Sequence, residues 1–339
     1  MMCWKPNTSH KTRQKRAQML HNIRAFFYDK NVLEVETPAL SLAGNTDPFI
    51  ESFQFTINNA TRYLHTSPEY PMKRLLASGS GDIYQICKVW RKGETGRNHN
   101  PEFTLLEWYR VGFSYHQLML EVQQLLHCLL PKLDSHSQFL TYEALFLEKF
   151  GFNPHIANHN ELIACVEKNI SGLNCDGLSS QGLLDALLTH CVEPDFSETC
   201  LTFVYDYPVS QSALAQLRQP KSIKTGGGVF EKSSTKIFND TNKHPVAERF
   251  EVYLGQIELG NGYQEEVSYR RNKNILQQEN GARKQGGLDP ITEDKHFLAA
   301  SEVGIPHSSG VAIGLDRILM CILGVDSIEE VINFPWDKA

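Results

Sequence analysis

The sequence lacks the features that would place it among membrane or secreted proteins. No apolar run approaches the ~18 residues that a membrane-spanning helix needs. The first 16 residues are polar and basic, and no apolar segment of the kind found in a secretory signal peptide follows them. The eight cysteines form no C-x-x-C pair, which disfavours a zinc site or a disulfide framework. These absences predict a cytoplasmic protein with reduced thiols.

Positive charge is also scarce. The 33 Lys and Arg residues face 39 Asp and Glu residues, and the formal net charge of −6 argues against nucleic-acid binding by bulk charge. Apolar residues are plentiful, because 41% of the 339 residues are hydrophobic, which excludes disorder over most of the chain. We expect one mixed α+β domain over residues 1–339, with an antiparallel sheet and flanking helices.

Hydrophobic periodicity predicts the elements of the N-terminal half. Apolar residues recur at spacings of three and four over residues 13–30, which predicts an amphipathic helix. Its apolar stripe consists of Ala17, Leu20, Ile23 and Phe27. Two β-branched and aromatic runs separated by a polar loop predict a hairpin. The strands of this hairpin are expected over 82–90 and 103–109. An extended segment is expected over 33–38, and a helix over 115–130.

The C-terminal half alternates short elements with one segment of different composition. Residues 218–245 are rich in Lys, Gly, Ser and Thr, which predicts a flexible insertion. The remaining elements expected here are short helices over 140–200, a strand over 201–206, a hairpin of 249–254 with 257–259, and a strand–turn–helix over 310–323.

One candidate site lies in the first hairpin. Glu107 and Tyr109 share a face of the predicted strand, because side chains alternate along it. A carboxylate and a phenol on one sheet face can hold an ammonium group through charge and a hydrogen bond. Taken alone, the pair is more often a solvent-facing acid beside a packed aromatic ring.

Three further patterns suit a nucleotide. The loop over 91–100 offers Arg, Lys and His side chains to a polyphosphate, although an exposed polar turn has the same composition. Glu258 and Glu265, seven residues apart around a turn, could hold Mg²⁺, although two surface acids would look alike. Gly310 and Gly314 permit close backbone approach where a strand meets a helix, and Arg317 would reach a terminal phosphate.

The order of these patterns resembles motifs 1, 2 and 3 of the class II aminoacyl-tRNA synthetases, and within that family the lysyl-tRNA synthetases. The resemblance implies the class II fold, an antiparallel sheet flanked by helices, and a homodimer formed through motif 1. The residues that carry it are Glu36-Thr37-Pro38, His99 to Thr104, Leu106-Glu107, Glu258-Leu259 with Asn261-Gly262, and Gly314-Leu315-Asp316-Arg317.

The motif 1 helix starts near residue 13, which leaves no room for an N-terminal anticodon-binding domain. In this the chain resembles truncated paralogues of the lysyl-tRNA synthetases, which attach a lysine-type amino acid to a lysine side chain of elongation factor P. Ser67 stands where the synthetases typically have Ala, and Ala312 where they typically have Gly. Both positions lie in the amino-acid pocket by resemblance, and small steric changes there suit (R)-β-lysine, whose amine is displaced by one carbon.

The resemblance also implies the role of each site residue. Arg91 and Arg317 would be catalytic, clamping the α- and γ-phosphates of ATP. The family's motif 2 usually reads Arg-Asn-Glu, and this chain departs from it at residues 92–94. The remaining ATP-binding residues would be Lys92, Gly93, Glu94, His99, Asn100, Phe103, Glu258, Leu259 and Gly314. The substrate would be bound by Ser67, Pro68, Glu69, Glu107, Tyr109, Glu265 and Ala312, and Mg²⁺ by Glu258 and Glu265.

The implied reaction has two steps, adenylate formation from ATP and transfer to an amine, and needs no enzyme nucleophile. Two other functions compete with a ligase acting on elongation factor P. An enzyme of the same chemistry could use tRNA, although the acidic balance and the missing anticodon domain disfavour this. A catalytically inactive paralogue could serve as a binding or regulatory module, but such a protein would have no physical reason to keep its phosphate clamps.

Overall fold

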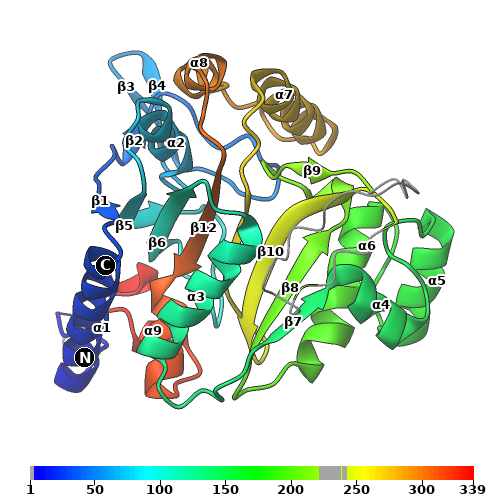
Figure 1. Cartoon of the computed structure of the whole chain (residues 1–339), viewed down its shortest axis with the longest axis horizontal. Helices are drawn as coiled ribbons and strands as arrows, with labels where there is room; N and C mark the ends of the chain where they lie inside the picture. Colours follow the sequence, from blue (N-terminus) through cyan, green and yellow to red (C-terminus); the bar gives the residue numbers. More distant parts are fainter. Residues whose placement is uncertain (1–3, 221–237, 239–242) are drawn as a thin grey trace, which may run out of the picture. The chain divides into compact units, whose positions relative to one another are not determined.

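The computed structural model describes residues 4–220, 238 and 243–339. The chain divides into two compact units, Met1–Pro131 with Glu265–Ala339, and Lys132–Gln264. Each is described by itself (Figure 1). Most of the predicted insertion over 218–245 lies outside the described residues, and the expectation of one domain over 1–339 stays a prediction.

The first unit contains four neighbouring strands of a mixed sheet. They follow the order β1 (Leu33–Glu34), β5 (Ile83–Trp90), β6 (Glu102–Val111) and β12 (Ser308–Gly314). β5 and β6 are antiparallel, which confirms the predicted hairpin, and β12 pairs antiparallel to β6. β1 runs parallel to β5, so the predicted antiparallel pairing does not extend to this edge of the sheet. Only two residues of the extended segment predicted over 33–38 are in a strand.

Helices and a small sheet complete the first unit. α1 (His10–Asp29), α3 (Tyr115–Leu129) and α9 (Leu315–Leu323) pack together, with α3 against β12 and α9 against β6. α2 (Glu69–Ala77) packs on α8 (Lys295–Val303), and α8 on α7 (Tyr269–Gln285). A separate antiparallel sheet consists of β2 (Leu40–Ser41), β4 (Ala60–Leu64) and β3 (Gln54–Ile57). Two short 3₁₀ turns lie at Ile328–Glu330 and Trp336–Lys338.

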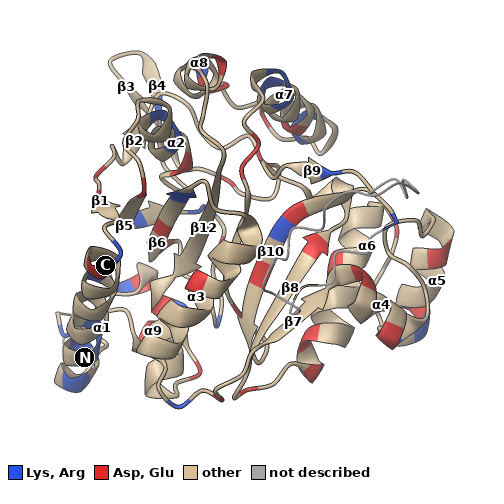
Figure 2. Ribbon diagram, in the orientation of Figure 1, with Lys and Arg blue, Asp and Glu red and all other residues tan. Residues whose placement is uncertain are grey.

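The buried stripe of α1 differs in part from the predicted one. Ile23 and Phe27 are fully buried as expected. Ala17 is exposed and Leu20 only half-buried, and Met19 takes the inner position. Met19, Ile23 and Phe27 follow one another at intervals of four, which places them in one row along the helix. The first turns of α1 carry the exposed basic residues Lys11, Arg13 and Lys15, and blue segments mark Lys and Arg along this helix (Figure 2).

The two faces of β6 have different partners. The indole of Trp108 donates to Glu121 Oε1 on α3 at 3.0 Å, so this residue points to the helix-covered face. Because side chains alternate along a strand, Glu107 and Tyr109 point to the opposite face. The same pleat therefore provides a core contact and presents two polar side chains to the site described below.

The second unit contains the strands β11 (Ile257–Gln264), β10 (Val246–Leu254), β8 (Leu201–Tyr207) and β7 (Gln138–Thr141), in that order, and β9 (Leu217–Arg218) also pairs with β10. β10 and β11 form the second predicted hairpin, and β7 is parallel to β8. The short helices predicted over 140–200 are confirmed. They are α4 (Tyr142–Phe150), α5 (His159–Asn169) and α6 (Ser180–Leu187), followed by a π-helical turn (Leu188–Val192) and 3₁₀ turns (Glu193–Asp195, Val209–Gln211).

A continuous apolar core lies between α4, α5, α6 and the strands of the second unit. Its largest members are aromatic, with Tyr142 stacked on Phe146 at a ring distance of 4.6 Å. In the described part of the chain, no helix combines the length and the apolarity that crossing a membrane requires.

Candidate active site

Three carboxylates and one lysine lie close together in the first unit, beside the face of β6 that is opposite to the helix-covered one. Lys73, Glu107 and Glu265 are 0%, 2% and 1% exposed, and Glu69 is partly buried. Glu69 and Lys73 come from α2, Glu107 from β6, and Glu265 from the segment leading to α7. Buried charges are expensive unless they are paired, so the contacts among these groups decide what the cluster can do.

Lys73 bridges two of the carboxylates. Its Nζ lies 2.7 Å from Glu69 Oε1 and 2.6 Å from Glu265 Oε2. The spacing of four residues places Glu69 and Lys73 on the same side of α2. Burial opposes the charge of Lys73, but the ion pairs with Glu265 and Glu69 outweigh it and raise its pKa above the ordinary value. Lys73 is therefore a cation at every physiological pH.

Glu107 is held by two hydroxyl groups. Tyr109 donates to Glu107 Oε1 at 2.7 Å, so the prediction that these two side chains share a face of the sheet is confirmed. Ser67 donates to Glu107 Oε2 at 2.6 Å, and its Oγ accepts the backbone N–H of Glu69 at 3.0 Å. Burial and the nearby charge of Glu69 raise the pKa of Glu107 to about 7, against the lowering effect of Ser67, Tyr109 and Lys73.

Ser67 was expected to contact the head of the amino acid. In the structure its hydroxyl orients Glu107 and joins the β6 carboxylate to the start of α2, where Pro68 occupies the N-cap position. Ala312 lies directly opposite Glu107 in the register of β12 and β6, so both residues are on one face. The two predicted departures from the synthetase pattern thus flank the same carboxylate.

Gly310 lies opposite Tyr109 and is needed for close packing. A Cβ atom built there would collide with Glu265 Oε1 and with the Tyr109 ring. Oε1 of Glu265 is buried without a hydrogen-bond donor, and burial raises the pKa of this carboxyl although Lys73 opposes the shift. Carboxylate oxygens are suitable ligands for Mg²⁺. Lys73 pairs with Oε2 of Glu265, so Oε1 is the oxygen that could bind the metal ion.

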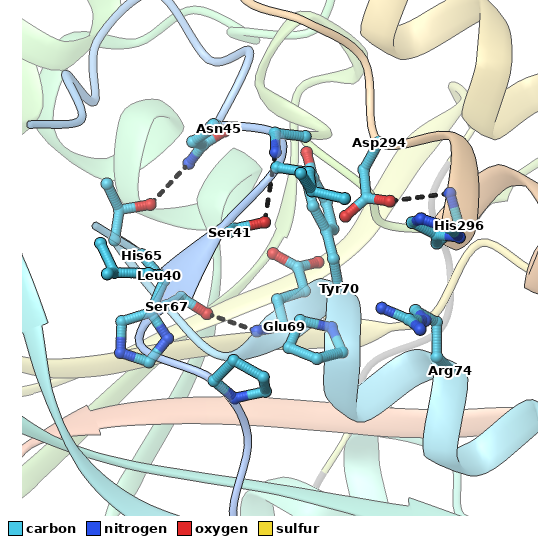
Figure 3. Close-up of a pocket in the computed structure, with 16 residues that line it drawn as sticks. Leu40, Ser41, Asn45, His65, Ser67, Glu69, Tyr70, Arg74, Asp294 and His296 are labelled. Carbon is cyan, nitrogen blue, oxygen red and sulfur yellow. Dashed lines mark hydrogen bonds between the residues drawn. The ribbon is translucent and has the colours of Figure 1, made fainter. Parts of the chain in front are cut away.

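A cavity of about 260 Å³ opens beside this cluster (Figure 3). It is bounded by the loop over 38–45, by residues 65–71 and by the start of α8. Glu69 and Ser67 line it, and its rim carries Arg74, Asp294 and His296. A pocket with the Glu69 carboxylate in its wall suits a small ligand that carries a positive charge.

The residues expected to bind ATP come from the hairpin loop and from the start of α9. The guanidinium of Arg91 lies over the Phe103 ring, with 5.1 Å between Cζ and the ring centroid. Nη2 of Arg317 lies 2.8 Å from Nε2 of His99. The structure therefore brings motif 2 and motif 3 together through this pair, and the role of Arg91 and Arg317 as phosphate clamps stays a prediction. Gly314 ends β12 immediately before α9.

Other members of the predicted ATP set are engaged within the protein. Lys92 pairs with Glu51 at 2.6 Å, and Glu94 lies 3.4 Å from Arg91. Gly93 has a φ of 82°, a left-handed conformation that favours glycine in this turn. The Asn100 amide donates to the Glu102 carbonyl at 2.6 Å and accepts the backbone N–H of Trp336 at 3.1 Å. Their roles in nucleotide binding stay predictions.

The last two predicted residues lie on β11, in the second unit. Leu259 is buried there, and the Glu258 carboxylate accepts a long hydrogen bond of 3.4 Å from the Asn261 side chain. The shared Mg²⁺ site of Glu258 with Glu265 stays a prediction.

Asp316 and Lys73 are two of several buried charged residues to which the sequence assigned no role. Asp316 Oδ2 accepts the backbone N–H of Thr104 at 2.6 Å, and Oδ1 pairs with Arg16 of α1. The signal for Lys73 was its distance of four residues from Glu69, and for Asp316 its position in the first turn of a helix that follows Gly314.

Comparison with known proteins agrees with this geometry. The family described as tRNA synthetases class II (D, K and N) matches residues 1–338, and the chain belongs to this family. The α+β fold and the enzyme class expected from the motifs are thereby confirmed.

The alignments with curated relatives span almost the full length of this chain and of each relative. The elongation factor P–(R)-β-lysine ligase of Histophilus somni (strain 2336) is 39% identical over 99% of this chain and 98% of its own. The ligases of the same name from Edwardsiella ictaluri (strain 93-146) and Vibrio parahaemolyticus serotype O3:K6 (strain RIMD 2210633) are 39% and 38% identical over 99% or more of both chains. The predicted resemblance to this group is confirmed.

Proposed function

We propose that the protein activates a lysine-type amino acid, (R)-β-lysine in particular, with ATP and transfers it to a lysine side chain of elongation factor P. The observation that carries the proposal is the buried carboxylate cluster. Glu107 with its two hydroxyl partners, and Glu69 beside the cavity, form an anionic site fitted to ammonium groups. The names of the relatives supply the class of substrate and the acceptor.

ATP would bind where Arg91 and Arg317 meet the hairpin loop. Both guanidinium groups can form paired hydrogen bonds with phosphate oxygens. In the first step the amino-acid carboxylate attacks the α-phosphate, and pyrophosphate leaves. Arg91 would stabilise the charge that develops there, and Arg317 would hold the leaving end. Mg²⁺, held by Glu265 and Glu258, would neutralise phosphate charge.

The second step requires a neutral acceptor amine, which attacks the carbonyl of the adenylate and releases AMP. An enzyme nucleophile is not needed, so the rate depends on positioning and electrostatics. The homodimer, the cytoplasmic location and the absence of a role for tRNA belong to the same proposal.

A labelled transfer assay tests the acceptor. The purified chain is given ATP, labelled lysine or (R)-β-lysine, and either elongation factor P or tRNA. We expect label on elongation factor P, with (R)-β-lysine preferred. Label on tRNA alone would assign the chain to the competing synthetase function, and pyrophosphate exchange with neither amino acid would identify an inactive paralogue.

Arg317→Ala tests the phosphate clamp in the same assay. Because the variant loses a charged fork from the polyphosphate site, we expect pyrophosphate exchange to fall by about 10²–10³-fold while the thermal unfolding midpoint stays close to that of the wild type. Lys149→Ala is the control, because Lys149 forms an exposed pair with Asp195 in the second unit and belongs to no predicted site. Unchanged exchange in folded Arg317→Ala protein would remove the motif 3 assignment.

A further inference from the structure

Lys73 is a buried cation inside a site that must bind cations. A cation in such a place repels an incoming ammonium group, so its presence needs a reason. Lys73 is 0% exposed, lies within 2.7 Å of Glu69 and 2.6 Å of Glu265, and has the Phe297 ring 5.8 Å from its Nζ. Its side chain is enclosed by other residues, so it acts on a ligand through the carboxylates that it holds.

The charge count of the cluster suggests the reason. Glu69, Glu107 and Glu265 provide three negative charges and Lys73 one positive charge, which leaves two negative charges in the ionised site. Lysine and β-lysine both carry two ammonium groups. Without Lys73, a bound lysine-type substrate would leave one buried carboxylate without a counter-charge, and such a charge is costly.

We propose that Lys73 is a specificity-determining positioning residue, which holds Glu69 and Glu265 in place and sets the site to the charge of a dicationic amino acid. The inference rests on the proposed function. Lys73 holds these two carboxylates by direct contact, whereas Glu107 is held by the hydroxyl groups of Ser67 and Tyr109.

The test compares lysine with norleucine, which has the same carbon chain and lacks the side-chain ammonium group. Calorimetry gives the affinity of each, and their ratio is the preference for a dication. Lys73→Met alone removes the cation between the buried Glu265 and the partly buried Glu69 carboxylates, a change that can prevent folding. The decisive pair is therefore Glu69→Gln and Glu69→Gln/Lys73→Met, because both lack the Glu69 charge and differ only at Lys73.

The second substitution is expected to increase the preference for lysine over norleucine, which is unusual for a further mutation in a binding site. Glu69→Gln leaves one net negative charge, and its preference for lysine over norleucine should fall at least ~10-fold below the wild type. Adding Lys73→Met restores two net negative charges. The preference for lysine over norleucine should then recover at least half of the decrease, measured on a logarithmic scale. A Lys73 that only supports the fold would give no such recovery.

Lys88→Met is the matched control, because Lys88 pairs with Glu102 on the exposed side of the hairpin and belongs to no predicted site. Its preference should equal that of the wild type. A double variant that prefers lysine no more than Glu69→Gln does would overturn the role of Lys73 and leave the proposed function intact. Wild-type protein that binds neither lysine nor (R)-β-lysine would overturn both.

Discussion

Glu107 illustrates how a single residue can be predicted in its chemistry and missed in its surroundings. The alternation along β6 was enough to place Glu107 beside Tyr109, because that relation is local. The Ser67 hydrogen bond joins residues 40 positions apart, and no local pattern encodes it. The sequence marked Ser67 as unusual, but only the structure shows that it binds the same carboxylate.

The raised pKa of Glu107, about 7, predicts a pH dependence for substrate binding. Below that pH the carboxyl is protonated and loses its attraction for ammonium groups. We expect the KM for lysine or (R)-β-lysine to rise about tenfold for each pH unit below about 7. The KM for ATP should change much less over the same range, and steady-state pyrophosphate exchange measures both.

Glu107→Gln is the control for that profile, because it cannot titrate. Its KM should be high and should lose the part of the pH dependence that is centred near 7, and a variant that keeps the wild-type profile would contradict the assignment. The rise in KM at acidic pH does not come from a loss of folded protein caused by the protonation of Glu107. The folded pKa of Glu107 exceeds the unfolded value, so its contribution to stability is present at acidic pH and is lost as the pH rises through about 7.

Gly310 provides a steric test of the same site. Gly310→Ala places a methyl group against Glu265 Oε1 and the Tyr109 ring, so one of them must move. We expect a loss of about 1–3 kcal/mol in the free energy of unfolding and a clear rise in the amino-acid KM. Chemical denaturation and pyrophosphate exchange measure the two effects.

Gly281→Ala is the comparison, because nothing lies within 4 Å of its added Cβ in helix α7. It should be neutral or stabilising by up to about 1 kcal/mol, since alanine is the better helix former. If Gly310→Ala behaved like Gly281→Ala, the close packing around Glu265 would have no energetic consequence.

At the scale of elements, strands were predicted well and their partners less well. Runs of β-branched and aromatic residues next to turns are local signals, and they predict β5, β6, β10 and the start of β11. The parallel pairs β1 with β5 and β7 with β8 join distant segments, and nothing in either strand specifies the direction of its partner. The stripe of α1 was misassigned at Ala17, because several apolar rows fit the helical period equally well.

Asp316 connects three elements and predicts a large stability effect. Its carboxylate binds the backbone of β6 through Thr104 and the side chain of Arg16 on α1, from a position that is 1% exposed. Asp316→Ala leaves the partly buried Arg16 guanidinium and the Thr104 N–H group without this partner. We expect a loss of about 3–5 kcal/mol in the free energy of unfolding, measured by denaturant titration.

Asp326→Ala is the matched variant, because Asp326 is 90% exposed in its pair with Arg97. An exposed pair contributes about 0–1 kcal/mol, so this change should barely move the titration midpoint. Equal losses in the two variants would show that Asp316 does not hold α1, β6 and α9 together.

For the whole molecule, the resemblance to class II synthetases predicts a homodimer formed through the segment from α1 to Pro38. Two large side chains there face solvent in the isolated chain, with Tyr28 81% and Leu33 56% exposed. β1 is also the outer strand of its sheet, and an open edge with exposed apolar residues favours association. A two-fold dimer is the commonest closed assembly.

We therefore expect light scattering at micromolar concentration to give twice the mass of one chain. Tyr28→Asp/Leu33→Asp should give the mass of a single chain, because two charges on each subunit would have to be buried in the interface. Val303→Asp adds a charge at an equally exposed valine, 82% accessible at the end of α8, and should leave the dimer intact. A wild-type protein of single-chain mass would exclude the motif 1 dimer, and a dimer that resists the double variant would place the interface on another surface.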